Sequence, residues 1–274
     1  MSSSRRSGLA AGASLALGLI LVGCAPTAPT AATSSEKPKL QVVQVAAASD
    51  LKFALDDIVT EFTGDHPEVE VAVTYGSSGN FATQIRQGAP FDLYLSADIR
   101  LAGELADENF GDPADVFEYA VGRLVVWAAN DSPADASAGI GGLTSDAVRT
   151  VAIANPEHAP YGQAAEAAMK NAGVYEQLAG KLVRGENIAQ AAEFALSGNA
   201  DAGIIALSLA LSPEMTAAGT YSEVPLDTFP TLHQGGLLLT GATDGARELM
   251  SFIQSERGQR VLAQYGFSPP PGEG

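Results

Sequence analysis

Cysteine is nearly absent from this chain of 274 residues: it occurs once, at position 24, and histidine occurs only three times. A single cysteine excludes a disulfide framework within the chain and a metal cluster held by several thiolates. The histidines stand at positions 66, 158 and 233 and form no His-Glu-x-x-His motif. The sequence therefore gives no indication of metal catalysis.

Basic residues are also few, with 15 Lys and Arg against 32 Asp and Glu and a formal net charge of -17. A field of this sign repels nucleic acid at long range, which excludes DNA and RNA as partners held through their phosphates. Aromatic residues make up only 7% of the chain, but hydrophobic residues make up 46%. That content excludes a disordered polymer and leaves enough apolar side chains for a sizeable core.

The N-terminus has the features of an export signal. Arg5 and Arg6 precede an uncharged apolar run over residues 9–22, which is too short to span a bilayer comfortably. We therefore predict a signal peptide over residues 1–23. The arginine pair leaves twin-arginine export open, although ordinary secretion is favoured because the residues after the pair do not complete that motif.

Residues 21–24 (LVGC) resemble a bacterial lipobox. This resemblance implies that Cys24 becomes the lipidated first residue of the mature chain, anchored to the outer face of the cytoplasmic membrane. Residues 24–39 then continue with Ala, Pro, Thr and Ser and show no periodicity, so we predict a flexible linker there.

Beyond the linker, short apolar runs alternate with stretches of helical periodicity. The alternation predicts an α/β fold of mainly parallel sheets with helices on both faces. Strands are expected over residues 40–46, 69–73, 91–95, 124–129, 150–154, 202–205 and 236–239. Helices are expected over residues 51–62, 81–85, 99–105, 164–172, 188–196 and 246–265.

The strand expected over residues 236–239 and the helix expected over residues 246–265 exceed what the second lobe alone would contain. We therefore predict that the chain returns to the first lobe. Lobe 1 then comprises residues 40–124 and 237–268, and lobe 2 comprises residues 125–236. Two crossings, near Val125 and Leu238, would leave a cleft between the lobes. Such a cleft is the usual place for a small ligand.

Polar residues stand where the first two strands lead into helices: Ser49 and Asp50 after one, Ser77 and Ser78 after the other. Ser49 is expected to cap the first helix. Helix N-termini offer unpaired N–H groups and the positive end of the helix dipole, and hydroxyls add further donors. Together these groups can hold an oxyanion without a positive side chain. A role as a helix cap would explain Ser49 or Ser78 taken singly, but it does not explain both turns equally well.

Two turns of the second set of elements are similar. Tyr161 stands at the entrance of the helix expected from residue 164, where a packing role is the alternative. Ile188 opens the next helix, and its backbone N–H is the useful group. His158 is expected near the surface or behind the ligand-binding residues, because no acidic or histidine partner lies at coordinating spacing.

Several segments in order resemble the molybdate-binding proteins of ABC importers. They are residues 46–51 (AAASDL), 75–79 (YGSSG), 88–92 (GAPFD), 96–98 (SAD), 155–160 (NPEHAP) and 265–267 (YGF). The similarity runs from about residue 40 to residue 267. It implies a two-lobed periplasmic-binding-protein fold and a monomer, not an enzyme, that needs no cofactor. It also implies high-affinity capture of molybdate or tungstate outside the membrane, followed by delivery to a permease and, through it, to its ATPase.

The resemblance further implies which residues bind the ligand. Ser49 and Ser78 would each give a hydroxyl and a main-chain N–H, and Asp50 a main-chain N–H. Lobe 2 would give the Tyr161 hydroxyl and the Ile188 amide. All five would contact molybdate oxygens, and none would bind a bare metal cation. Many family members have a tyrosine where this chain has Ala206, whose side chain cannot donate a hydrogen bond. A subgroup of the family resembles this chain at residues 160–162 and 185–188, so the resemblance assigns the phenol to Tyr161.

The chemistry of the ligand agrees with this assignment. A doubly charged tetrahedral oxyanion only accepts hydrogen bonds, so a site made of N–H and O–H donors fits it. Rigid donors spaced for long metal–oxygen bonds would select against the smaller sulfate. Closure of the lobes would bring the second half of the donors to the ion.

Three alternatives stay open. The same fold can bind another anion, such as sulfate, phosphate or a small organic anion. A hydrolytic enzyme could use Ser49, Asp50 and His158, but the chain has no G-x-S-x-G elbow. A receptor for metal cations would suit the acidity, but the proposed turns lack clustered carboxylates or histidines.

Overall fold

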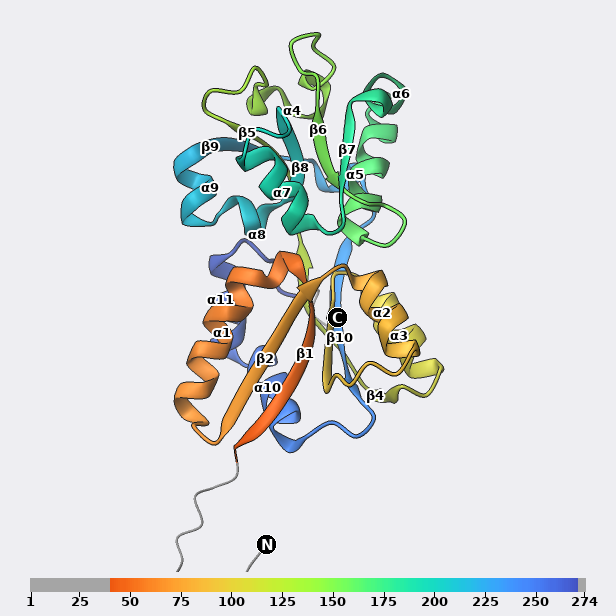
Figure 1. Cartoon of the computed structure of the whole chain (residues 1–274), viewed down its shortest axis with the longest axis vertical. Coiled ribbons are helices and arrows are strands. Elements are labelled where there is room, and N and C mark those ends of the chain that lie inside the picture. Colours follow the sequence, from red (N-terminus) through yellow and green to blue (C-terminus); the bar gives the residue numbers. More distant parts are fainter. Residues whose placement is uncertain (1–39, 271–274) are drawn as a thin grey trace, which may run out of the picture. The chain divides into compact units, whose positions relative to one another are not determined.

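Two five-stranded sheets, each flanked by helices, make up the computed structural model, which describes residues 40–270 (Figure 1). The predicted signal peptide over residues 1–23, the predicted lipidation at Cys24 and the linker over residues 24–39 lie outside the described residues. Within that described range, every helix is too short or too polar to cross a membrane.

The first sheet has the strand order β2-β1-β3-β10-β4. Its strands are β1 Gln41–Ala48, β2 Val69–Gly76, β3 Leu93–Ser96, β4 Gly111–Gly122 and β10 Leu232–Leu239. Strand β1 is parallel to β2 and β3, and β10 is antiparallel to β3 and β4. The register pairs Ala48 with Gly76, so the turns after β1 and β2 begin side by side at one edge.

Helices cover both faces of this sheet (Figure 1). They are α1 Lys52–Asp65, α2 Ser78–Arg86, α3 Ile99–Asp107, α10 Asp244–Gln254 and α11 Glu256–Gln264, with a 3-10 turn, η1 Ser49–Leu51, before α1. Helices α1, α10 and α11 pack on one face and α2 and α3 on the other, each group with its own hydrophobic cluster. Helix α1 buries Ala54, Leu55, Ile58 and Phe62, which recur every three or four residues on one side.

The second sheet repeats this plan in the order β7-β6-β8-β5-β9. Its strands are β5 Leu124–Ala129, β6 Val151–Ala154, β7 Leu182–Gly185, β8 Ala202–Ala206 and β9 Gly219–Glu223. Strand β6 is parallel to β7 and β8, and β5 is antiparallel to β8 and β9. Strands β6 and β8 are buried throughout, as expected for strands covered on both faces.

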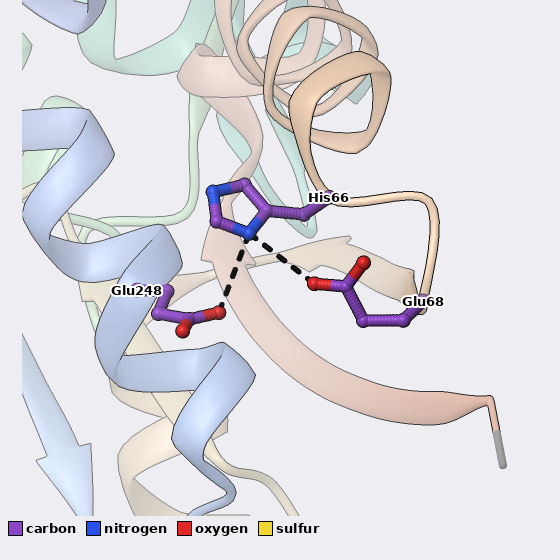
Figure 2. Close-up of side chains that lie close together, drawn as sticks. All are labelled: His66, Glu68 and Glu248. Carbon is purple, nitrogen blue, oxygen red and sulfur yellow. Dashed lines mark ion pairs between the residues drawn. The ribbon is translucent and has the colours of Figure 1, made fainter. Parts of the chain in front are cut away.

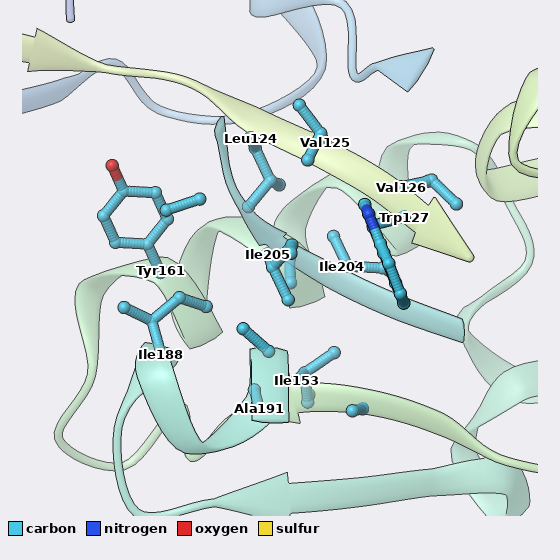
Figure 3. Packing of buried hydrophobic residues seen from close by; sticks show 14 of the residues in the cluster. Leu124, Val125, Val126, Trp127, Ile153, Tyr161, Ile188, Ala191, Ile204 and Ile205 are labelled. Atoms are coloured by element: carbon cyan, nitrogen blue, oxygen red, sulfur yellow. The ribbon is translucent and has the colours of Figure 1, made fainter. Parts of the chain in front are cut away.

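The helices of the second lobe are shorter on average. They are α4 Gly139–Gly142, α5 Pro160–Asn171, α6 Tyr175–Leu178, α7 Ile188–Leu196, α8 Leu207–Ala210 and α9 Pro213–Ala218, with 3-10 turns η2 Ala136–Ala138, η3 Ala179–Lys181 and η4 Leu226–Thr228. The core of this lobe contains the fully buried Trp127 of β5, whose indole N–H donates to the Met215 carbonyl. Figure 3 shows Tyr161 and Ile188 packed against the same core.

The predicted α/β fold with two lobes is confirmed. Each sheet joins a parallel group of three strands to an antiparallel pair. The final helical stretch is two helices, because Ser255 adopts an extended backbone and caps α11 through its hydroxyl. Strand β10 already begins at Leu232, inside the range 125–236 expected for lobe 2. We therefore propose that the chain crosses between lobes near Arg123 and again just before Leu232.

Candidate ligand-binding site

A small cavity of about 10 Å³ lies where residues of the two lobes meet. Its lining comprises Ala48, Ser49, Asp50, Gly76, Ser77, Ser78, Ala97, Ala159, Pro160, Tyr161 and Ile188. All five residues predicted to bind the ligand are in this set. Among the described residues, no Lys, Arg or His side chain lines the cavity.

Two helices of nine residues begin at the cavity, α2 with Ser78 and α7 with Ile188. The first N–H groups of a helix have no partner within it and carry the positive end of its dipole. In α7, the Ala189 N–H donates to the Ser49 hydroxyl and the Gln190 N–H donates to the Asn187 side chain. The Ile188 N–H is therefore the donor of this turn that is available to a ligand.

Ser49 is not the helix cap predicted from the sequence. It opens the turn η1, whereas α1 begins at Lys52 and receives no side-chain cap. The Ser49 hydroxyl instead donates to Asn187 Oδ1, at 3.1 Å, and accepts from the Ala189 N–H, at 3.2 Å. Because the start of α7 lies so close, the hydroxyl finds its partners in the other lobe and not in its own turn.

Ser78 does not cap a helix through its side chain either, because it is already the first residue of α2. Its hydroxyl oxygen accepts from the Ala97 N–H at 3.0 Å, and its carbonyl accepts from the Tyr94 hydroxyl at 2.8 Å. A hydroxyl that accepts through its oxygen still has its hydrogen to donate. Ser78 is therefore fixed in position with one donor left for a ligand.

A second contact between the lobes joins Ser77 and His158. The Ser77 hydroxyl donates to the His158 carbonyl, at 2.5 Å, and lies 2.9 Å from Nδ1 of the same residue. The Gly79 N–H donates to this carbonyl as well, at 2.9 Å, and a Cβ at Gly79 would lie 2.6 Å from the carbonyl oxygen. His158 thus stands behind the cavity lining, as expected.

The hydrolytic set considered as an alternative is not assembled in this structure. The Ser49 hydroxyl is bonded to Asn187, and the His158 ring is within hydrogen-bond reach of Ser77. A serine nucleophile needs a histidine base on its own hydroxyl. The observed pairing therefore does not support that reading.

Asp50 is buried, 1% exposed, at the centre of a polar network. The Gln234 side-chain N–H₂ donates to Asp50 Oδ2 at 2.6 Å and to the Tyr161 hydroxyl oxygen at 3.0 Å. The Tyr119 hydroxyl donates to Gln234 Oε1 at 3.0 Å, and the Ser208 hydroxyl donates to the Asp50 carbonyl at 2.7 Å. Asp50 Oδ1 has no hydrogen-bond partner within the described residues.

Burial changes the proton affinity of this network. Loss of solvent raises the pKa of Asp50 to about 6, although the hydrogen bond from Gln234 partly opposes the rise. Burial also raises the pKa of Tyr161 well above its usual value, and the nearby charge of Asp50 adds to this effect. Tyr161 therefore keeps its proton at any physiological pH and can act only as a neutral hydroxyl.

The sequence interpretation missed Gln234 and Tyr119. Strand β4, which contains Tyr119, was not predicted at all. Gln234 lies in the strand sequence LHQGGLLL, where a glutamine among apolar residues was a signal that could have been used. Ala206, where many family members have a tyrosine, is the buried last residue of β8.

One further group of potential metal ligands occurs among residues 40–270, outside the cavity lining (Figure 2). His66 Nδ1 lies 3.5 Å from a carboxylate oxygen of Glu68 and 3.5 Å from one of Glu248. Both glutamate side chains are about half exposed, at 48% and 50%. The three residues form a solvent-exposed ion-pair cluster.

Two mixed α/β lobes that hydrogen-bond to each other around a small cavity define a two-lobed solute-binding protein. The chain belongs to the bacterial extracellular solute-binding protein family, whose family model matches residues 43–268.

Comparison with individual proteins confirms the resemblance found in the sequence. The chain is 40% identical over 212 residues to the molybdate-binding protein ModA of Rhodobacter capsulatus, covering 77% of this chain and 80% of the relative. It is 33% identical over 255 residues to ModA of Azotobacter vinelandii, covering 92% and 95%. The solved structure of the periplasmic molybdate-binding protein of Azotobacter vinelandii superposes with a TM-score of 0.78 at 26% identity, covering 84% of this chain and all of that one.

Proposed function

We propose that this protein captures molybdate, or tungstate, with high affinity outside the cytoplasmic membrane and delivers it to an ABC importer. The molybdate-binding relatives support this function. Within the chain, one observation carries it: the residues lining a cavity between two lobes offer several N–H and O–H donors, one acid, Asp50, and, in the described range, no cationic side chain. A dianion that only accepts hydrogen bonds matches such a lining.

Each of the five predicted residues has a role in this proposal. Ser78 gives its free hydroxyl hydrogen and its N–H at the start of α2, and Ile188 gives its N–H at the start of α7. Tyr161 gives its hydroxyl, in place of the tyrosine missing at position 206. Ser49 and Asp50 give main-chain N–H groups from η1, and the Ser49 hydroxyl, which now bridges to Asn187, can turn to the ion.

The bridging contacts suggest how binding is coupled to closure. Ser49 and Ser77 join the lobes through Asn187 and His158 at two edges of the cavity. The donors of lobe 1 alone would give a half-open site, and closure adds Tyr161 and Ile188 while it removes water. Hydrogen bonds to a charged group are worth roughly 1.5–3 kcal/mol each, so the second half of the donors is decisive for affinity.

We further propose that residues 1–23 are removed and that lipidated Cys24 holds the protein, as a monomer, at the outer face of the membrane. The partners are then an ABC permease and, through it, its ATPase. The role is binding and delivery and not catalysis. The second candidate function is capture of another oxyanion, such as sulfate, by the same donors.

Calorimetry on residues 25–274 distinguishes these possibilities. The protein is titrated separately with molybdate, tungstate, sulfate and phosphate at equal ionic strength. We expect tight one-to-one binding of molybdate and tungstate and no binding of sulfate at a comparable concentration. Tight sulfate binding with weak molybdate binding would establish the second candidate in place of the first.

A further inference from the structure

Asp50 is the one carboxylic acid among the residues that line the cavity, and no Lys, Arg or His lines it in the described part of the chain. Gln234 donates to its Oδ2 atom, and the nearby Tyr161 hydroxyl also lowers the pKa of the carboxyl. Its Oδ1 atom is buried and makes no hydrogen bond within the described part of the chain. A buried carboxylate oxygen without a donor is costly, so it marks a position that another group must satisfy. Because Asp50 lines the cavity, an anion bound there would lie beside this residue.

No positive charge compensates this carboxylate from the elements around it. Its ionisable neighbours within the cavity walls and the polar network are two tyrosines, Tyr161 and Tyr119. Helix α8 supplies only the Ser208 hydroxyl. The other ionisable side chains on the surrounding elements are exposed to solvent or already have a partner. Those exposed on α1 and α7 are Lys52, Asp56, Asp57 and Glu193. His233 of β10 is paired with Glu118 of β4, and His158, before α5, lies against Ser77.

We propose that Asp50 couples oxyanion capture to the uptake of one proton, so that its carboxyl group is protonated in the occupied site and donates a hydrogen bond to the anion. This inference rests on the function proposed above. The proton comes from water and forms an O–H bond on the Asp50 carboxyl, and no other bond changes.

Electrostatic repulsion explains why Asp50 should take up a proton when the anion binds. A dianion beside an ionised carboxylate in a cavity that excludes water meets strong repulsion, and it also faces an acceptor where it needs a donor. Protonation removes both penalties at once, because the carboxyl becomes a neutral donor. The free protein is already prepared for this change, since burial brings the pKa of Asp50 to about 6 before any anion arrives.

Because binding is coupled to proton uptake, the affinity for the anion should depend on pH. Where Asp50 is ionised in the free protein and protonated in the complex, affinity falls by up to about tenfold for each unit rise in pH. We therefore expect capture to weaken from about pH 6.5 to pH 8, although the donors in the cavity do not themselves titrate in this range.

The test uses the full chain, purified in mild detergent and titrated with molybdate by calorimetry. Experiments at about pH 7 in two buffers of different ionisation enthalpy give the number of protons taken up, and a series from about pH 6.5 to 8 gives the slope of affinity. We expect uptake approaching one proton per molybdate. Asp50→Asn should bind without uptake and with affinity independent of pH, whereas Asp107→Asn, at the exposed end of α3, should behave as wild type.

The outcomes separate this inference from the proposed function. Molybdate binding by the wild type without proton uptake would overturn the role of Asp50 and leave the function intact. Absence of molybdate binding would overturn both. If Asp50→Asn does not fold, Tyr161→Phe replaces it. Binding should then weaken while the proton uptake persists, because the phenol carries its proton before and after binding. Loss of the uptake in Tyr161→Phe would reject the assignment of the proton to Asp50.

Discussion

The side chain of Gln234 donates a hydrogen bond to the buried carboxylate of Asp50 across 2.6 Å, although 184 residues separate them in the chain. Gln234 belongs to β10, the strand that returns to lobe 1, whereas Asp50 follows β1 at the other end of the described sequence. The same amide also reaches Tyr161 of lobe 2. The return of the chain to its first sheet therefore supplies the amide that holds two residues of the cavity wall, Asp50 and Tyr161.

Removal of the Gln234 amide should destabilise the folded protein. Gln234→Leu leaves both Asp50 Oδ2 and the Tyr161 hydroxyl oxygen without the donor that Gln234 supplies, in the buried interior. We expect the free energy of unfolding near pH 7 to fall by at least about 1–3 kcal/mol, measured by urea denaturation. Gln254→Leu, at the exposed end of α10, is the matched control and should change stability little. Equal effects of the two substitutions would argue against the network.

Asp50 should make the stability of the free protein depend on pH. Its pKa is raised from 3.8 to about 6, so the folded state binds more protons than the unfolded state between these values. The contribution of Asp50 to stability is therefore greatest below the lower value and falls as pH rises through about 6, by up to about 3 kcal/mol. We expect Asp50→Asn to lose this fall in urea denaturation at about pH 5, 6 and 7. Parallel pH profiles of variant and wild type would contradict the raised pKa.

The sequence predicted the elements that carry strong local signals. The helix over residues 188–196 matches α7, and the turns after β1 and β2 were located correctly, because apolar periodicity and serine-rich turns are local features. The partners of the site were not predictable in this way. The bond of Ser49 to Asn187 and that of Asp50 to Gln234 depend on how distant segments pack, and no spacing in the sequence encodes them.

The end of strand β4 shows why that packing has little tolerance. A Cβ added at Gly122 would lie 2.3 Å from the Tyr161 hydroxyl oxygen and 2.6 Å from Gln234 Nε2. We expect Gly122→Ala to displace both side chains and so to lower both thermal stability and affinity for molybdate.

Gly103, in the interior of α3, provides the opposite control. A Cβ there meets nothing within 4 Å, so Gly103→Ala should stabilise the protein by roughly 0.5–1 kcal/mol through helix propensity. Its affinity for molybdate should stay unchanged. If Gly122→Ala were as well tolerated as Gly103→Ala, the close approach of Tyr161 to β4 would be wrong.

Single donor deletions test the binding roles directly. Ser78→Ala and Tyr161→Phe should each weaken molybdate binding by about 1–3 kcal/mol, measured by calorimetry, because each removes a hydroxyl from the cavity. Ser78→Ala should also cost some stability, since the Ala97 N–H loses its acceptor. Wild-type affinity in both variants would show that the anion binds elsewhere.

Ser208 tests whether affinity depends on contacts between the lobes that do not touch the ligand. Its hydroxyl donates to the Asp50 carbonyl at 2.7 Å from α8, but Ser208 is not part of the cavity lining. Ser208→Ala removes this donor from a buried carbonyl, so we expect about 1–3 kcal/mol weaker binding of molybdate, with solution scattering showing a larger fraction of open lobes. Ser251→Ala loses a similar hydroxyl-to-carbonyl bond on exposed α10 and should leave affinity unchanged. Unaltered affinity in Ser208→Ala would mean that the donors lining the cavity hold the lobes together by themselves.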